Sequence, residues 1–422
     1  MPVGAALGGR PITQGSHIGL PLPGRIEKAI PKLAAGAPPA EFGSTLAEIY
    51  RCRFAPLLPH LDGIKRLIVI AQDWAAVLPV EALLSGEPGK TSLDCASWPW
   101  LCDLYEISYA PSVTTLDILC RQREARKARQ WDKALFAVGD PPFSEEQLAQ
   151  MKSEKHPLTA GTGGATDASL LALGRAIRFD PTAVPPRLPG TRREVEVLAS
   201  LLGPEKSLLL LGPDASERKL FEASERGELK KCRYVHLATH GLADGERPEL
   251  SALLLARGSK DPDYDGLLQM REVFHLKLDA DLVVLSACRT GLGKQLRGEG
   301  VVGLSTAFFF AGTPSLVMSL WNVPDVSTAL LMRRFYANLT AGQTKAAALR
   351  EAKAWLRNLT VGALAKLGQE DPLYGRGMPR PYSGLTRAFG EAVRVPSGPL
   401  VEDKPFAHPH FWAGFVLTGD PK

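Results

Sequence analysis

Two apolar segments of the sequence end in residues that can carry out nucleophilic chemistry. Tyr234–Thr239 is followed by His240 and Gly241, and Leu282–Ala287 is followed by Cys288. A cysteine sulfur can attack a carbonyl carbon, and a neighbouring histidine can take up and return the proton that this reaction moves. Because the carboxyl ends of parallel strands meet at one edge of a sheet, strands over these segments would bring His240 and Cys288 together. The pattern predicts a Cys-His dyad.

The order of the two residues and the interval between them indicate which class of cysteine peptidase the sequence fits. His240 precedes Cys288 by 48 residues. Caspase-type peptidases place the histidine roughly 50 residues before the cysteine, whereas papain-type peptidases place the cysteine first. A third orienting residue is not required, because a thiol whose pKa is lowered by a histidine partner is already a good nucleophile. We also expect the backbone amides of Gly241 and Cys288 to form an oxyanion hole, since both would lie where the tetrahedral oxygen develops.

The same residue types have simpler interpretations. An isolated buried cysteine at a strand end is commonly an inert, small apolar side chain. His236 lies four residues before His240, on the same face of the strand, so with Cys288 it raises the alternative of a zinc site. No fourth ligand has suitable spacing. We therefore expect no metal and interpret His236 as a packed strand residue. His408 and His410 are expected to pack or hydrogen-bond rather than to catalyse, and no glycine motif for a nucleotide cofactor occurs.

Apolar strands and helical segments alternate along most of the chain. This alternation is typical of a largely parallel sheet covered on both faces, and it predicts an α/β fold. Thr191 and Glu194 have the spacing of a capping box ahead of a helix over 195–202, and Asp214 and Glu217 have the same spacing ahead of the next helix. The expected strands are 67–71, 105–109, 134–138, 208–211, 234–239, 252–256, 282–287, 315–320 and 411–418, and the expected helices include 112–129, 301–311, 327–339 and 345–359.

Composition divides the chain into four stretches. Residues 1–44 are rich in Gly, Pro and Ala, and we expect a linker or a truncated boundary there with a short helix near 25–34. Residues 45–140 would form a non-catalytic N-terminal α/β portion. Residues 141–189 are expected to be a flexible loop. Residues 190–422 would form the catalytic part, with an insertion at 368–404. The long loops are candidates for gating or self-cleavage.

The bulk composition excludes several classes of partner. The 50 basic and 45 acidic residues nearly balance over 422 positions, and no basic stripe with interleaved aromatic residues suggests nucleic acid as a partner. No uninterrupted apolar run is long enough for a membrane span, and the N-terminus lacks a secretory signal pattern, so we expect a cytoplasmic protein. Six cysteines are too sparse and irregular for a disulfide framework. Reduced thiols are therefore expected.

Several motifs in this order resemble the CHAT-domain family, whose members are peptidases related to caspases and separase. The likeness extends over most of residues 60–419. It implies a caspase-like three-layer α/β/α fold with His240 and Cys288 as the dyad. Family members often carry helical tetratricopeptide repeats, which this sequence lacks. The motifs that carry the resemblance are Tyr109-Ala-Pro-Ser112, His236-Leu-Ala-Thr-His-Gly241, Leu285-Ser-Ala-Cys-Arg-Thr-Gly291, Gly298-Glu-Gly-Val-Val-Gly-Leu304, Ala311-Gly-Thr-Pro314, Ser319-Leu-Trp-Asn-Val-Pro-Asp325 and Phe411-Trp-Ala-Gly-Phe415.

Asp325 has two interpretations. The segment from Trp321 to Asp325 resembles the separase stretch whose aspartate receives a basic P1 side chain, so the carboxylate would favour Arg or Lys in a substrate. Alternatively, Asp325 follows Pro324 and simply favours the N-terminus of a helix through the helix dipole.

The sequence therefore predicts a cysteine endopeptidase that cleaves a protein or peptide substrate, with a protein activator as a further expected partner. Binding would use an extended substrate segment beside the sheet. The alternative is a catalytically silent CHAT-like interaction or scaffold module that keeps the fold without turnover. The presence of both His240 and Cys288 favours the enzyme.

Overall fold

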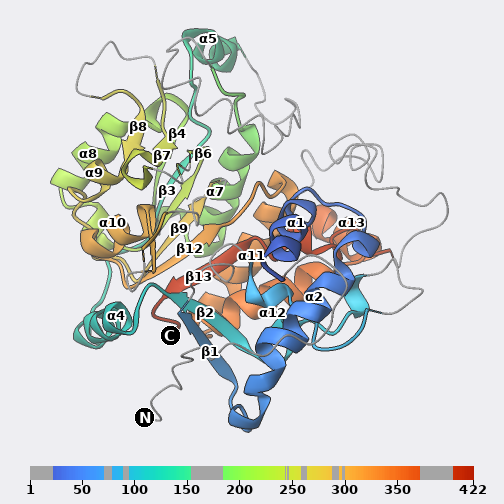
Figure 1. The fold of residues 1–422 in the computed structure, drawn as a ribbon. Helices are drawn as coiled ribbons and strands as arrows, with labels where there is room; N and C mark the ends of the chain where they lie inside the picture. The colour runs from blue at the N-terminus through green and yellow to red at the C-terminus, as the bar shows by residue number, and fades with distance from the viewer. Residues whose placement is uncertain are drawn as a thin grey trace.

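The protein is built around one eight-stranded sheet (Figure 1). The computed structural model describes residues 22–70, 78–88, 95–153, 184–242, 244, 247–257, 264–287, 294–296, 300–370 and 403–422. Cys288 therefore lies outside the described residues. In spatial order the strands are β1 (Arg66–Ile70), β2 (Glu106–Ala110), β13 (Phe415–Gly419), β12 (Ser315–Ser319), β9 (Leu282–Ser286), β5 (Cys232–Ala238), β3 (Lys133–Gly139) and β4 (Ser207–Leu211).

Strand direction decides which loops share an edge of this sheet. Every neighbouring pair is parallel except β12 and β13, which are antiparallel. β3, β5, β9 and β12 therefore all end at the same edge, whereas β1 and β2 end at the opposite one. The connections that follow these four central strands are brought together at one place, which is where ligand and catalytic groups gather in parallel sheets.

Helices cover both faces of the sheet and complete three layers, which confirms the predicted α/β/α architecture with a largely parallel sheet (Figure 1). Alternate strand residues explain the two cores, because successive side chains point to opposite faces. Leu282 and Val284 of β9 pack with α7, α11 and α12, while Val283 and Leu285 pack with α8, α9 and α10. The helices are α1 (Leu22–Ala34), α2 (Gly43–Ile49), α3 (Leu101–Leu104), α4 (Val113–Ala125), α5 (Glu145–Ser153), α7 (Pro189–Leu202), α8 (Glu217–Glu225), α9 (Met270–Val273), α10 (Leu304–Ala311), α11 (Asp325–Thr340), α12 (Lys345–Asn358) and α13 (Val361–Glu370).

Two strand predictions and one helix prediction need correction. The segment 252–256 was expected in the main sheet, but β7 (Ala252–Leu254) lies in a separate antiparallel sheet with β6 (Gly241–Leu242) and β8 (Leu267–Gln269). The helix expected over 301–311 begins at Leu304, because residues 300–302 form β11, which pairs with β10 (Lys294–Leu296). The last strand begins at Phe415 rather than 411, after a 3₁₀ turn over Pro409–Phe411.

The two capping-box interpretations were wrong. Helix α7 begins at Pro189, and the Thr191 hydroxyl donates to the carbonyl of Leu188 inside its first turn. The Glu194 carboxylate is instead hydrogen-bonded to His236. In the next helix Ser216 is the cap, and its hydroxyl accepts from the backbone N–H of Lys219. Serine at this position satisfies a free N–H of the first turn.

In the segment 1–44, expected to be a linker or a truncated boundary, the short helix expected near 25–34 is confirmed as α1, and Leu33 and Phe42 are fully buried in the main core. His408 and His410 both contact this segment, and the ring of His410 lies against Gly36. His408 Nε2 is 2.9 Å from the carbonyl oxygen of Ala37, and the ring of His408 meets that of Phe42 edge to face. The expectation that these histidines serve packing is confirmed. No helix within the described ranges has the length and apolar character needed to cross a membrane.

Candidate functional site

The register of β5 and β9 relates the two predicted catalytic residues. Each of the five paired positions, from Tyr234 opposite Leu282 to Ala238 opposite Ser286, joins residues 48 apart in sequence. The same interval separates His240 from Cys288. His240 lies two residues beyond the end of β5, and the backbone N–H of Thr239 still donates to the carbonyl of Ser286 at 3.2 Å. The structure thus places His240 at the carboxyl edge of the sheet, next to the strand that leads to Cys288.

His240 is buried, and its two ring nitrogens have different surroundings. Nε2 lies 2.7 Å from the carbonyl oxygen of Pro186. Because a carbonyl only accepts, Nε2 carries the proton, and Nδ1 of the neutral ring is an acceptor. No hydrogen-bond partner for Nδ1 is found among the described residues. The ring also packs against Phe143, with centroids 5.4 Å apart. Desolvation lowers the pKa of His240, and the bond to Pro186 partly opposes this shift.

Gly241 begins the strand that turns away from the main sheet. The backbone N–H of Leu254 donates to the carbonyl of His240 at 2.9 Å, and Gly241 pairs with Leu253 in the next register position. Since hydrogen-bonded and non-hydrogen-bonded pairs alternate in an antiparallel ladder, the N–H of Gly241 is directed away from β7. The Gly241 N–H therefore does not donate a hydrogen bond to β7.

Asp325 is the first residue of α11, which is where the helix-dipole interpretation placed it. Its side chain is exposed, yet it lies against Gly190 in the first turn of α7: a Cβ added at Gly190 would come within 2.9 Å of the Asp325 Cβ. The protein that surrounds this exposed carboxylate raises its pKa to about 6, chiefly by desolvation and secondarily through the negative charge of Glu194.

One segment of chain connects the surroundings of His240 and Asp325. Pro186 touches His240, and Gly190, four residues later, touches Asp325. Four residues span at most about 14 Å. The described residues do not bring His240 and Asp325 into direct contact, but they place both beside the start of α7.

His236 occupies the interior of β5 and is fully buried. Its Nε2 is 2.9 Å from a carboxylate oxygen of Glu194, and its Nδ1 is 3.3 Å from the hydroxyl of Tyr336. Both ring nitrogens are thus occupied by protein groups, which confirms the prediction of a packed strand histidine. Among the described residues no three His, Cys, Asp or Glu side chains come together as a set of metal ligands.

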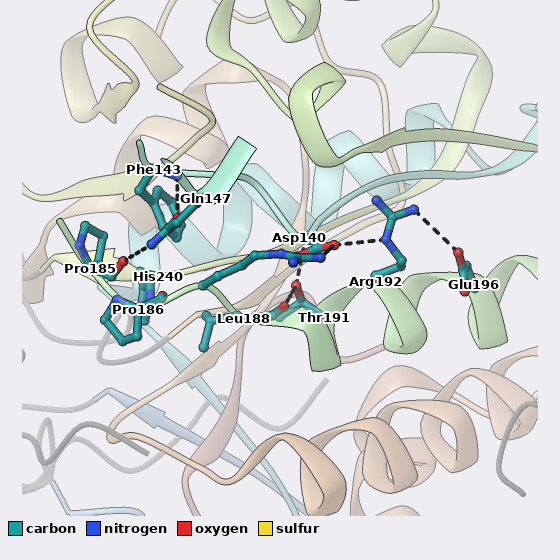
Figure 2. A network of polar contacts seen from close by, with 11 residues as sticks. Asp140, Phe143, Gln147, Pro185, Pro186, Leu188, Thr191, Arg192, Glu196 and His240 are labelled. Atoms are coloured by element: carbon teal, nitrogen blue, oxygen red, sulfur yellow. Dashed lines mark hydrogen bonds and ion pairs between the residues drawn. The ribbon is translucent and has the colours of Figure 1, made fainter. Parts of the chain in front are cut away.

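Sequence reasoning missed a polar cluster beside His240 (Figure 2). Its centre is Asp140, which is fully buried directly after β3 and has a left-handed φ of 56°. The guanidinium of Arg187 donates to both Asp140 oxygens at 2.7 and 2.9 Å, and Arg192 donates at 2.9 Å. The Thr191 hydroxyl accepts from the Asp140 N–H at 2.8 Å. An aspartate that directly follows an apolar strand was the available signal, but its partners lie 47 to 52 residues further along the chain, and Arg187 falls in the expected loop 141–189.

The comparisons with known proteins bear on family rather than on mechanism. A family model for the CHAT domain matches residues 43–420. Tetratricopeptide repeat protein 28 of Homo sapiens is 25% identical over 267 residues, which cover 55% of this chain and 8% of that protein, and the Mus musculus protein gives the same figures. The chain therefore spans a small part of these curated relatives.

Solved structures give weaker likenesses. Two structures of the Saccharomyces cerevisiae separase–securin complex are 13% identical with TM-scores of 0.32 and 0.36; they cover 60% and 68% of this chain and 13% and 14% of theirs. The arginine-specific cysteine proteinase gingipain R is 10% identical with a TM-score of 0.38, covering 94% of this chain and 74% of that one. These similarities are too low to carry an argument, whereas the family match covers most of the sequence. The chain belongs to the CHAT domain family.

Proposed function

We propose that this protein is a cysteine endopeptidase in which Cys288 is the nucleophile and His240 accepts the proton of the Cys288 thiol and passes it to the leaving amine. The observation that carries the proposal is the register of β5 and β9, whose constant offset of 48 residues is also the interval between His240 and Cys288. The acceptor Nδ1 of His240, which no described residue occupies, and membership in the CHAT domain family support it further.

The environment of His240 favours general-base activation of a neutral thiol. Its lowered pKa keeps the imidazole neutral near pH 7, so Nδ1 accepts the proton of the Cys288 thiol as the sulfur attacks the peptide carbonyl. The proton then passes to the leaving amine as the C–N bond breaks. Water hydrolyses the resulting thioester and regenerates the thiol. The contact with Pro186 shows the tautomer that has its proton on Nε2, which leaves Nδ1 to accept the thiol proton.

Two further roles complete the proposal. The amides of Gly241 and Cys288 bind the oxyanion of the tetrahedral intermediate, and the outward direction of the Gly241 N–H supports its part. Asp325 selects a basic P1 side chain. Its exposed carboxylate at the start of α11, close to the turn that leads from Pro186, supports this role. A protein segment in extended conformation is the substrate.

A fluorogenic peptide library varied at P1 tests the proposal under reducing conditions. We expect hydrolysis by the parent chain to disappear in Cys288→Ala and to persist in Cys232→Ala. Cys232 is a matched control because it is buried at the other end of β5, where desolvation raises its pKa to about 12. Hydrolysis that survives in Cys288→Ala would contradict the dyad.

A catalytically silent interaction module is the second candidate, and one observation favours it. His240 is only 4% exposed and is covered by Pro186 and Phe143, so a substrate has little access to the ring in this conformation. Such a module would show no cysteine-dependent hydrolysis with any peptide of the library.

A further inference from the structure

Three consecutive residues, which we name the strap, cross the carboxyl edge of the sheet at His240. The strap comprises Pro185, Pro186 and Arg187, and Figure 2 shows Pro185 and Pro186 beside His240. Each residue is held by a different partner. The Gln147 side-chain amide donates to the carbonyl of Pro185 at 2.7 Å, His240 donates to the carbonyl of Pro186 at 2.7 Å, and Arg187 pairs with Asp140.

The ion pair between Arg187 and Asp140 is the strongest contact that holds the strap. Its guanidinium makes two short bonds to Asp140, and its side chain is 8% exposed against 0% for the aspartate. Paired guanidinium–carboxylate bonds in a buried setting are directional and costly to break, because each partner would be left with an uncompensated charge. Asp140 has Arg192 as a second cation, so its charge stays paired when Arg187 is removed. Arg187 can therefore be replaced without stranding the aspartate.

Because the strap contains two prolines, it can cover the site without pairing as a further strand of the sheet. Proline has no N–H and a fixed φ, so Pro185 and Pro186 offer carbonyls and no ladder donors. Their restricted backbone also reduces the entropy that is lost when the segment is held in place. The strap then runs into the first turn of α7, where Gly190 meets Asp325. It therefore lies along the path between the two predicted site residues.

We propose that the strap is an internal inhibitory segment that covers His240 and must leave before a substrate reaches it. The expected effect on peptide hydrolysis rests on the proposed function, but the accessibility of His240 can be measured without any substrate. When the Arg187–Asp140 and Gln147–Pro185 contacts are lost, the Pro186 carbonyl leaves Nε2 and the imidazole becomes accessible. Peptide hydrolysis then rises.

The test is the rate at which diethyl pyrocarbonate modifies His240, followed by peptide mass spectrometry. We expect a rise of about tenfold in Arg187→Ala and a smaller rise in Gln147→Ala, with Arg187→Lys between Arg187→Ala and the parent because lysine keeps a charge but not the two-bond geometry. His236 is an internal control for folding: it is fully buried away from the strap, so its modification should stay slow.

Arg66→Ala is the matched control variant. Arg66 also makes two bonds to one carboxylate, at 3.0 and 2.9 Å to Glu106, but these join the edge strand β1 to its neighbour β2. We expect it to leave His240 modification unchanged. Unchanged modification of His240 in both Arg187→Ala and Gln147→Ala would overturn the strap, whatever the peptide assay shows. Faster modification without cysteine-dependent hydrolysis would support the strap and contradict the proposed peptidase.

Discussion

The interior and the carboxyl end of β5 hold two histidines with opposite environments. His236 has both ring nitrogens bonded to side chains, Glu194 and Tyr336, in the middle of the strand. His240 has one nitrogen bonded to a backbone carbonyl, while its other nitrogen has no partner among the described residues. The two residues are four apart and both are buried. The hydrogen bonds of the ring nitrogens, rather than burial, therefore distinguish a structural histidine from a candidate catalytic one.

Replacing His240 should have the largest effect on turnover. We expect His240→Ala to lower kcat/KM for peptide hydrolysis by about 10²–10⁴, because general acid–base transfer is lost. Steady-state kinetics with the best peptide of a P1 library would measure this. His275→Ala is a suitable control, since His275 lies beyond α9 and outside the described site. An equal loss of kcat/KM in the two variants would contradict a catalytic role for His240.

Replacing His236 should act on stability instead. We expect His236→Leu to lower the free energy of unfolding by about 3–5 kcal/mol, because the buried Glu194 carboxylate loses its partner. Urea unfolding measures this change. The double variant His236→Leu with Glu194→Leu should be less destabilised than the single one, since no buried charge is then left unpaired. A single variant as stable as the parent would contradict the structural assignment, and turnover per folded molecule should change little.

Asp325 should affect selectivity more weakly. We expect Asp325→Asn to reduce the preference for Arg over Leu at P1 by about tenfold, the size of one charge-assisted hydrogen bond. The raised pKa of about 6 sets a pH test. The carboxylate is charged above pH 6 and neutral below it, so the parent should lose the same preference as the pH falls through 6. A preference that depends on pH equally in Asp325→Asn would show that another group selects P1.

The strand-end positions of the site followed from local pattern. A continuous apolar segment that ends in a reactive residue located His240 just beyond β5, and the Pro324-Asp325 pair located the start of α11. The 48-residue interval then matched the register of two neighbouring strands. The apolar segments and the interval between them can be read from a single sequence, and the general geometry of parallel sheets then relates their ends.

The cover over His240 could not be predicted in the same way. Residues 141–189 were expected to be a flexible loop, yet Glu145–Ser153 form α5, and Gln147 and Arg187 bond to groups far from them in sequence. Asp140 shows why: its left-handed backbone and its two arginine partners depend on tertiary packing, for which propensity and spacing carry no signal. Likewise the capping-box pattern at Glu194 gave way to a buried bond with His236.

The alkylation rate of Cys288 by iodoacetamide at pH 7 tests the central claim most directly, because it needs no substrate. It would be measured in the parent and in Arg187→Ala, each with and without His240→Ala, using exposed Cys52 as the internal reference thiol. If His240 activates Cys288, its replacement lowers the alkylation rate of Cys288 by about tenfold or more and leaves Cys52 unchanged. A Cys288 rate that is independent of His240 in both backgrounds would contradict the dyad.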